Sequence, residues 1–179
     1  MNVLARIRAG GREIECGLAT TEQERTAVLA QRFRVYQRRG YFRPGLEVDR
    51  DTHDDTAAYF LAMLPDGDLG CVLLGSARLI LGESRAGFRF PAEKAFEFEL
   101  PAGIRETAVT QRHEVTRVVA ESVRGIVIGG LMTPLGLIQA ISEHTRPLDV
   151  PCGLAVNQAA PPAGAPGPRR ACTRSNLPG

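Results

Sequence analysis

Residues 113–120 read HEVTRVVA. The β-branched and other apolar residues of this stretch predict a β-strand. The strand runs into the glycine-containing loop 124–130, which precedes a predicted helix over 131–144 and an apolar strand over 148–156. A strand, a loop, a helix and a second strand in this order indicate a sheet with helices packed on it.

Upstream of this strand the sequence predicts a helix and an antiparallel hairpin. A capping box that starts at Thr21 opens a helix whose apolar residues recur at helical spacing until about Gly40. Two strand-like runs, 58–64 and 71–81, are joined by a turn that contains Asp-Gly, which is typical of a hairpin. One or two further strands are expected within residues 2–17.

These elements predict an α+β domain over residues 1–156, with a central mixed sheet flanked by helices. Prolines interrupt residues 82–110, where we expect loops and one short helix near 92–98. Residues 157–179 differ from the rest, because thirteen of these positions are Pro, Gly or Ala and no apolar periodicity is present. Such a segment buries too little surface to offset its ordering entropy, so we expect a disordered tail.

The bulk composition suits one ordinary globular domain, since 44% of the 179 residues are hydrophobic and 23% are charged. No apolar run reaches the roughly 18–20 residues that cross a bilayer. The N-terminus also lacks the apolar core of a signal peptide. We therefore expect a cytoplasmic protein without stable membrane insertion.

The charge distribution argues against a nucleic-acid-binding protein, and the cysteines argue against a zinc or disulfide framework. Of the net charge of +2, the tail supplies three positive charges (Arg169, Arg170 and Arg174) and no negative one, which leaves residues 1–156 at −1. A nearly neutral body argues against nucleic-acid binding, which needs excess positive charge. The four cysteines form no CxxC pair or Cys/His cluster, so neither a zinc site nor a disulfide framework is indicated.

Charged side chains inside the strand at 113–120 are the first candidates for a functional site. Alternation places Glu114 and Thr116 on one face of this strand and Arg117 on the other. A carboxylate or a guanidinium is costly to bury unless it is paired. One interpretation is an edge strand with solvated charges. The other is a carboxylate that acts as a base, with an arginine that holds an anion or another carboxylate.

Arg78 lies in the strand-like sequence GSARLIL, so it too is either a solvated charge on a strand or a charge paired at a functional site. The acidic segment 47–55, EVDRDTHDD, holds five acids in nine residues. By itself this segment fits a solvated loop or a weak metal site, although the spacing of an EF-hand is absent. Its acids would match Arg78 and Arg117, so we expect acids and arginines to meet across a cleft.

Two further features suit acidic or phosphate-bearing ligands. The run RFRVYQRR contains no acid and is either a solvated helix face or a docking surface for an acidic partner; its arginines are Arg32, Arg34, Arg38 and Arg39. The loop 124–130 offers backbone N–H groups at a helix N-terminus, which favour phosphate.

Six segments, taken together and in this order, resemble the acyl-homoserine-lactone synthases and their relatives, the N-acyl amino acid synthases and the exosortase-associated acyltransferases. All three are lineages of the GNAT superfamily. The segments are RFRVYQRRGY (32–41), LEVDRD (46–51), AYFLA (58–62), GSARL (75–79), EVTRVVA (114–120) and LIQAISEHT (137–145).

The resemblance implies a GNAT-like fold and a transfer of a fatty acyl group to an amine. Glu114 would take a proton from the attacking amine, and a backbone N–H of its strand would stabilise the oxyanion. Asp49 would position the amino substrate, while Arg78 and Arg117 would order the acidic loop and the cleft. The remaining residues expected to contact the substrate are Glu47, Ser76 and Thr116.

The implied donor is the phosphopantetheine thioester of acyl carrier protein, or coenzyme A, used as a co-substrate and not retained as a bound cofactor. The phosphate of its pantetheine arm would contact the glycine loop, through Arg124, Gly129 and Gly130. Acyl carrier protein would dock on the basic helix, at Arg32, Arg34, Arg38 and Arg39.

Within this resemblance we favour synthesis of an N-acyl amino acid or a related amide, because the stretch YQRRGY is closer to those branches. An acyl-homoserine-lactone synthase is the first alternative. A truncated, inactive relative that at most binds acyl carrier protein is the second. The relatives continue after the strand at 148–156 with another helix and strand, where this chain has the tail 157–179, as a frameshift or truncation would produce.

Overall fold

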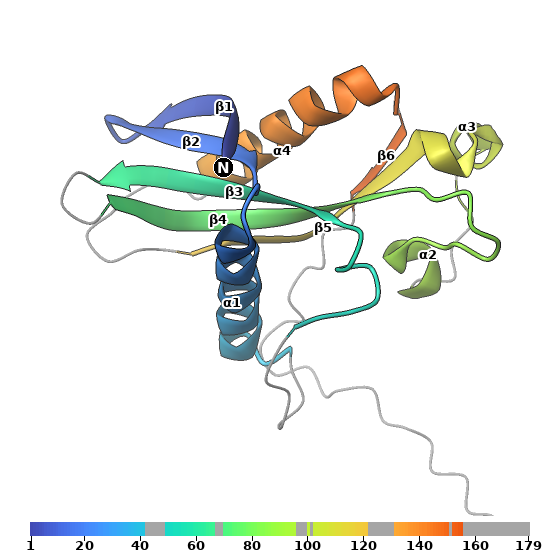
Figure 1. Cartoon of the computed structure of the whole chain (residues 1–179), viewed down its shortest axis with the longest axis horizontal. Coiled ribbons are helices and arrows are strands. Elements are labelled where there is room, and N and C mark those ends of the chain that lie inside the picture. Colours follow the sequence, from blue (N-terminus) through green and yellow to red (C-terminus); the bar gives the residue numbers. More distant parts are fainter. Residues whose placement is uncertain are drawn as a thin grey trace, which may run out of the picture.

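The computed structural model describes residues 1–41, 49–66, 70–95, 100, 102–121, 131–150 and 152–155. Six strands form one sheet in chain order (Figure 1). The strands are β1 (Asn2–Ala9), β2 (Arg12–Leu18), β3 (Ala58–Asp66), β4 (Gly70–Leu81), β5 (Arg112–Ala120) and β6 (Cys152–Ala155). The helices are α1 (Glu22–Arg38), α2 (Pro91–Ala95), α3 (Ala102–Glu106) and α4 (Met132–Thr145), with 3-10 turns at Val109–Gln111 and Arg146–Leu148.

The sheet is mixed, as predicted. Each pair of neighbouring strands from β1 to β5 is antiparallel, whereas the last pair, β5 and β6, is parallel. The parallel pair is connected through α4, which lies on one face of the sheet, while α1 lies on the opposite face (Figure 1). The α+β class and the flanking helices are therefore confirmed. None of the helices in the described ranges combines the length and apolar character needed to cross a membrane.

Local sequence signals account for the first helix and the hairpin. The Thr21 hydroxyl accepts from the backbone N–H of Glu24 at 3.2 Å, and the Glu24 carboxylate accepts from the Thr21 N–H at 3.1 Å, which confirms the capping box. Strands β3 and β4 pair as an antiparallel hairpin, which is also confirmed.

The end of the described chain departs from the prediction. The strand expected over 148–156 is shorter, Cys152–Ala155, because a 3-10 turn with Pro147 in its first turn continues from α4. Asp149 then adopts a left-handed backbone with φ of 51°, which ends the turn. Helix α3 was not predicted. The tail 157–179 and the loop 124–130 lie outside the described residues.

The sheet divides the core into two unequal parts. On the α4 side, large side chains such as Phe60, Leu79 and Leu137 form an extended apolar cluster. Gly136 permits this close packing, because a Cβ there would lie 2.6 Å from the Cys16 sulfur. On the α1 side the apolar cluster is small, and buried polar and charged side chains fill much of the space. The candidate site lies on this second side.

Candidate functional site

Two fully buried arginines hold the acidic loop against the sheet. Arg32 of α1 donates from Nε and Nη2 to Asp49 Oδ2, at 3.1 and 2.9 Å, and from Nη1 to Asp54 Oδ1 at 2.8 Å. Arg78 of β4 donates from Nη1 to Asp51 and to Asp54, both at 2.8 Å. The expectation that acids of this loop meet arginines is thus confirmed, and residues 49–54 are fixed to α1 and β4 at once.

Arg117 joins the same network through a β-bulge. The pairing of β4 with β5 shifts between Ser76 and Arg78, so that one extra residue is inserted in β5. Arg117 has a positive φ of 56°, and its Nη2 lies 3.4 Å from Asp49 and 3.5 Å from Asp51. The prediction that Arg117 points to the face opposite Thr116 was therefore wrong, because regular alternation stops at the bulge.

Arg32 and Arg78 fix the charge state of Asp51 and Asp54. Burial alone would raise the pKa of Asp54, but the hydrogen bond and charge of Arg32 and the charge of Arg78 outweigh it and hold that pKa well below its usual value. Arg78 likewise outweighs burial at Asp51 and lowers its pKa. These carboxylates are ionised at neutral pH and are engaged by arginines, so neither is a candidate base.

Glu114 is the exception among the buried acids. Its side chain is 1% exposed, Oε2 accepts the backbone N–H of Ala92 at 3.1 Å, and Oε1 has no partner in the described part of the chain. Burial raises the pKa of Glu114 to about 7. A carboxyl group with this pKa can exchange a proton with a reactant near neutral pH, which is what general acid–base chemistry requires.

The other predicted site residues fall into two groups. Thr116 and Ser76 are buried and already hydrogen-bonded: Thr116 accepts from Arg78 Nε at 2.9 Å, and Ser76 donates to Gln31 Oε1 at 2.8 Å. Both hydroxyls thus stabilise the site, and their contact with a substrate stays a prediction. The remaining predicted residues lie outside the described ranges; they are Glu47, Arg124, Gly129 and Gly130.

The prediction of a docking surface on α1 is wrong at one of its four arginines, Arg32. Arg32 is completely buried and cannot belong to a docking surface. Helical spacing could have revealed this, because Arg32 lies on the same side of α1 as the buried Val28 and Val35. Arg34 and Arg38 are exposed and pair with Glu121, at 3.0 and 3.2 Å, so an acid from the end of β5 partly neutralises this surface.

The acidic loop also contributes residues that the sequence analysis did not single out. Asp51 and Asp54 contact the arginines directly, and the side chain of Asp51 is 33% exposed while that of Asp49 is 6% exposed. Asp51 is therefore the more accessible carboxylate of the network. Within the described residues, no three His, Cys, Asp or Glu side chains are grouped as around a metal ion.

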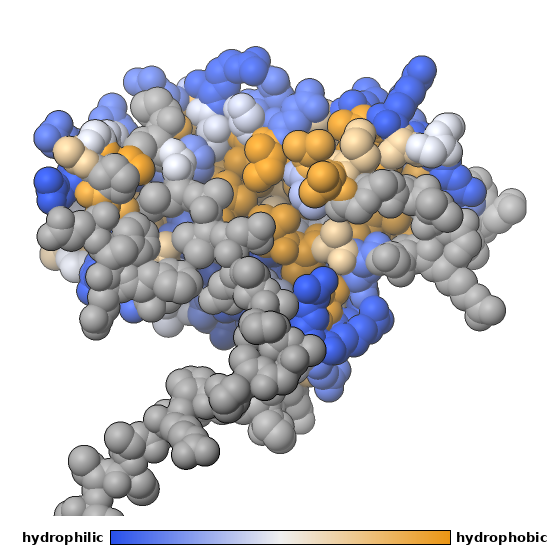
Figure 2. All heavy atoms as spheres, turned by 180° about the vertical axis from the view of Figure 1, so that it is seen from behind, coloured by the Kyte–Doolittle hydropathy of each residue, from blue (hydrophilic) through white to orange (hydrophobic). Residues whose placement is uncertain are grey.

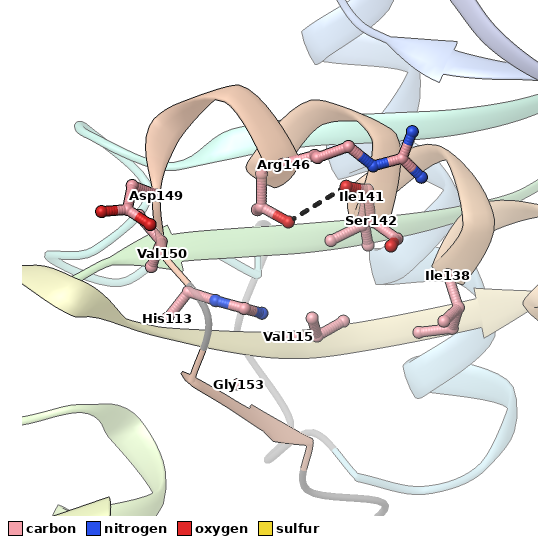
Figure 3. Close-up of a pocket in the computed structure, with 10 residues that line it drawn as sticks. His113, Val115, Ile138, Ile141, Ser142, Arg146, Asp149, Val150 and Gly153 are labelled. Atoms are coloured by element: carbon pink, nitrogen blue, oxygen red, sulfur yellow. Dashed lines mark hydrogen bonds between the residues drawn. The ribbon is translucent and has the colours of Figure 1, made fainter. Parts of the chain in front are cut away.

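A cavity of about 500 Å³ lies on the opposite face of β5, under α4. Figure 3 shows His113 and Val115 of β5 below Ile138 and Ile141 of α4. The other lining residues are Ser142, Thr145, Arg146, Asp149, Val150 and Gly153. Apolar side chains also gather on the face seen in Figure 2, and Leu131, Leu135 and Ile138 are exposed at helical spacing at the start of α4. Sequence patterns did not predict this cavity.

The raised pKa of Glu114 predicts a pH effect on stability. The folded protein binds the Glu114 proton more tightly than the unfolded chain, so this contribution is complete below about pH 4.5 and is lost as the pH rises through about 7. Between these values the free energy of unfolding of wild type should fall by about 3 kcal/mol relative to Glu114→Gln. Urea unfolding of both proteins at several pH values checks this. Parallel pH profiles would show that Glu114 is not the group that titrates.

Comparisons with protein families, with curated proteins and with solved structures find no match to this chain.

Proposed function

We propose that this chain is an N-acyltransferase that moves a fatty acyl group from an acyl carrier protein or coenzyme A thioester to the amine of an amino acid. The observation that carries the proposal is Glu114, a buried carboxyl group with a pKa of about 7 and one oxygen without a partner among the described residues. An amine in neutral water is mostly protonated and attacks a thioester only after it loses a proton. Its nitrogen becomes positively charged again as it attacks, and a base of this pKa suits the removal of that second proton.

In the proposed reaction the ammonium group first loses one proton to water, and the neutral amine then attacks the thioester carbonyl while its nitrogen transfers a second proton to Glu114. The C–S bond then breaks, an amide forms, and the protonated Glu114 returns the proton to the leaving thiolate. No oxidant, metal ion or covalent enzyme intermediate is needed. The product is an N-acyl amino acid and a free thiol.

The buried network supports this proposal as a scaffold for the base. Arg32, Arg78 and Arg117 reach the acidic loop from α1, β4 and β5, so they hold it beside the strand that carries Glu114. Asp51 and Asp49 each pair with two arginines, but the side chain of Asp51 is 33% exposed and that of Asp49 is 6% exposed, so Asp51 is the acid that the ammonium form of the incoming amine can reach.

The cavity under α4 supports the choice of a fatty acyl donor. Its lining includes the apolar side chains Val115, Ile138 and Ile141 together with polar ones such as His113 and Arg146, and it lies on the face of β5 opposite to Glu114. Cavities of several hundred Å³ with few polar groups typically hold apolar ligands. We therefore infer that the acyl tail occupies this space.

Thiol release tests the proposal. Purified full-length protein should release free thiol from long-chain acyl carrier protein or acyl-coenzyme A, and only when amino acids are added. Mass spectrometry of the product then distinguishes an open-chain amide from a lactone. If neither donor releases thiol above the rate without protein, for any of the pooled amino acids, the chain is not an acyltransferase of this kind.

A further inference from the structure

We propose that Lys94, which His53 positions, binds the carboxylate of the acceptor, so that the acceptor is a free amino acid and not a simple amine. This inference rests on the proposed function, which it deepens by naming how one class of substrate is recognised. It uses two residues whose side chains contact each other and, among the described residues, form no ion pair with the network of acids and arginines.

The site is built from α2 and the acidic loop. Lys94 Nζ lies 3.3 Å from Nε2 of His53, whose side chain is buried while Lys94 is exposed. An ammonium group can only donate, so Nε2 accepts and the neutral ring carries its proton on Nδ1. Burial and the Lys94 charge both lower the pKa of His53, which keeps the ring neutral near pH 7. Phe88 fixes the ring by an edge-to-face contact at 6.0 Å.

Lys94 lacks a negative partner within the described residues. It is the only lysine of the chain and forms no ion pair there. The neighbouring acid Glu93 is already engaged, since it accepts the Phe90 N–H at 2.8 Å and lies 3.9 Å from Arg112. Lys94 has three donors and uses one of them on a neutral imidazole. Its charge and its two remaining donors suit a carboxylate from outside the protein.

The two segments that carry Lys94 and His53 also contact the proposed base and its network. Ala92, two residues before Lys94, donates its N–H to Glu114 at 3.1 Å. Asp51, two residues before His53, accepts the His53 N–H at 2.9 Å and also pairs with Arg78. Helix α2 therefore carries both the N–H that contacts the proposed base and the ammonium group that contacts His53. An amino acid carries both an amine for the proposed base and a carboxylate for the Lys94 ammonium.

The substitution Lys94→Gln tests the inference, because it keeps a polar side chain of similar size and removes the charge. The assay compares an amino acid with its carboxamide, which keeps the amine but has no negative charge. For wild type we expect the amino acid to have the lower KM, by roughly tenfold or more. Lys94→Gln should raise the KM of the amino acid by a similar factor and leave the KM of the carboxamide and both kcat values nearly unchanged.

Two controls keep this test separate from that of the proposed function. Arg105→Gln removes one exposed positive charge on α3 and should leave both KM values unchanged. Direct binding of the amino acid and of its carboxamide, measured by saturation-transfer NMR, requires no acyl transfer. Binding that is lost in Lys94→Gln without any thiol release would support the site and overturn the transferase. Acyl transfer with equal use of both acceptors, or no effect of Lys94→Gln on amino-acid binding, would overturn the site.

Discussion

Glutamine in place of Glu114 should lower kcat/KM for acyl transfer by roughly 100-fold or more, the usual effect of removing a general base. The amide has nearly the same shape as the carboxyl group, and its oxygen can still accept the N–H of Ala92. What is lost is the ability to take a proton. Thiol release, measured for both proteins at saturating donor and varied amino acid, gives the ratio.

The pH profile makes this prediction specific to Glu114. Burial raises the pKa of Glu114 to about 7, so the active, ionised form is depleted below that pH. The kcat/KM of wild type should therefore rise more steeply with pH below about 7 than above it, where only deprotonation of the amine still adds to the rate, while Glu114→Gln should lack this change of slope. Glu121→Gln changes an acid that pairs with surface arginines beyond the end of the same strand and should behave as wild type. Equal thiol release by wild type and Glu114→Gln would exclude Glu114 as the base.

Glu114 and Arg117 illustrate what a strand pattern can and cannot predict. Alternation correctly placed Glu114 on the same side of β5 as Thr116, and the cost of burying a charge marked it as unusual. The same alternation failed at Arg117 because the bulge, with its positive φ, leaves no clear signal among β-branched neighbours. Regular patterns thus predict the faces of a strand only as far as its pairing stays regular.

Contacts between residues far apart in the sequence explain the other differences between the predictions and the structure. The capping box at Thr21 and the hairpin turn after β3 depend on residues close in sequence, and both were predicted. The burial of Arg32 depends on acids 17 and 22 positions away, so a run rich in arginine resembled an exposed basic surface. The cavity under α4 requires a helix and a strand to be placed together, which composition does not reveal.

Arg32→Ala should be the most destabilising single change in the site. Asp49 and Asp54 would keep their burial and lose the guanidinium that neutralises them, which costs more than the loss of the hydrogen bonds alone. Breaking a buried ion pair by removing one partner typically costs about 3–5 kcal/mol, a large part of the 5–15 kcal/mol that stabilises a typical domain. We therefore expect the midpoint of urea unfolding at pH 7 to fall sharply, with loss of acyl transfer.

Arg34→Ala is the matched control, because Arg34 is on the same helix and also pairs with an acid, but its side chain is 49% exposed. Water solvates Glu121 in its place, so the expected loss is below about 1 kcal/mol. If Arg32→Ala does not fold, Arg32→Lys gives the measurement, since a lysine keeps the charge but cannot bridge both acids with a planar fork. We expect Arg32→Lys to fold, with a free energy of unfolding that is positive but lower than that of wild type. Equal stability of the Arg32 and Arg34 variants would mean that the buried network does not hold the loop, and the order of residues 49–54 beside Glu114 would then need another cause.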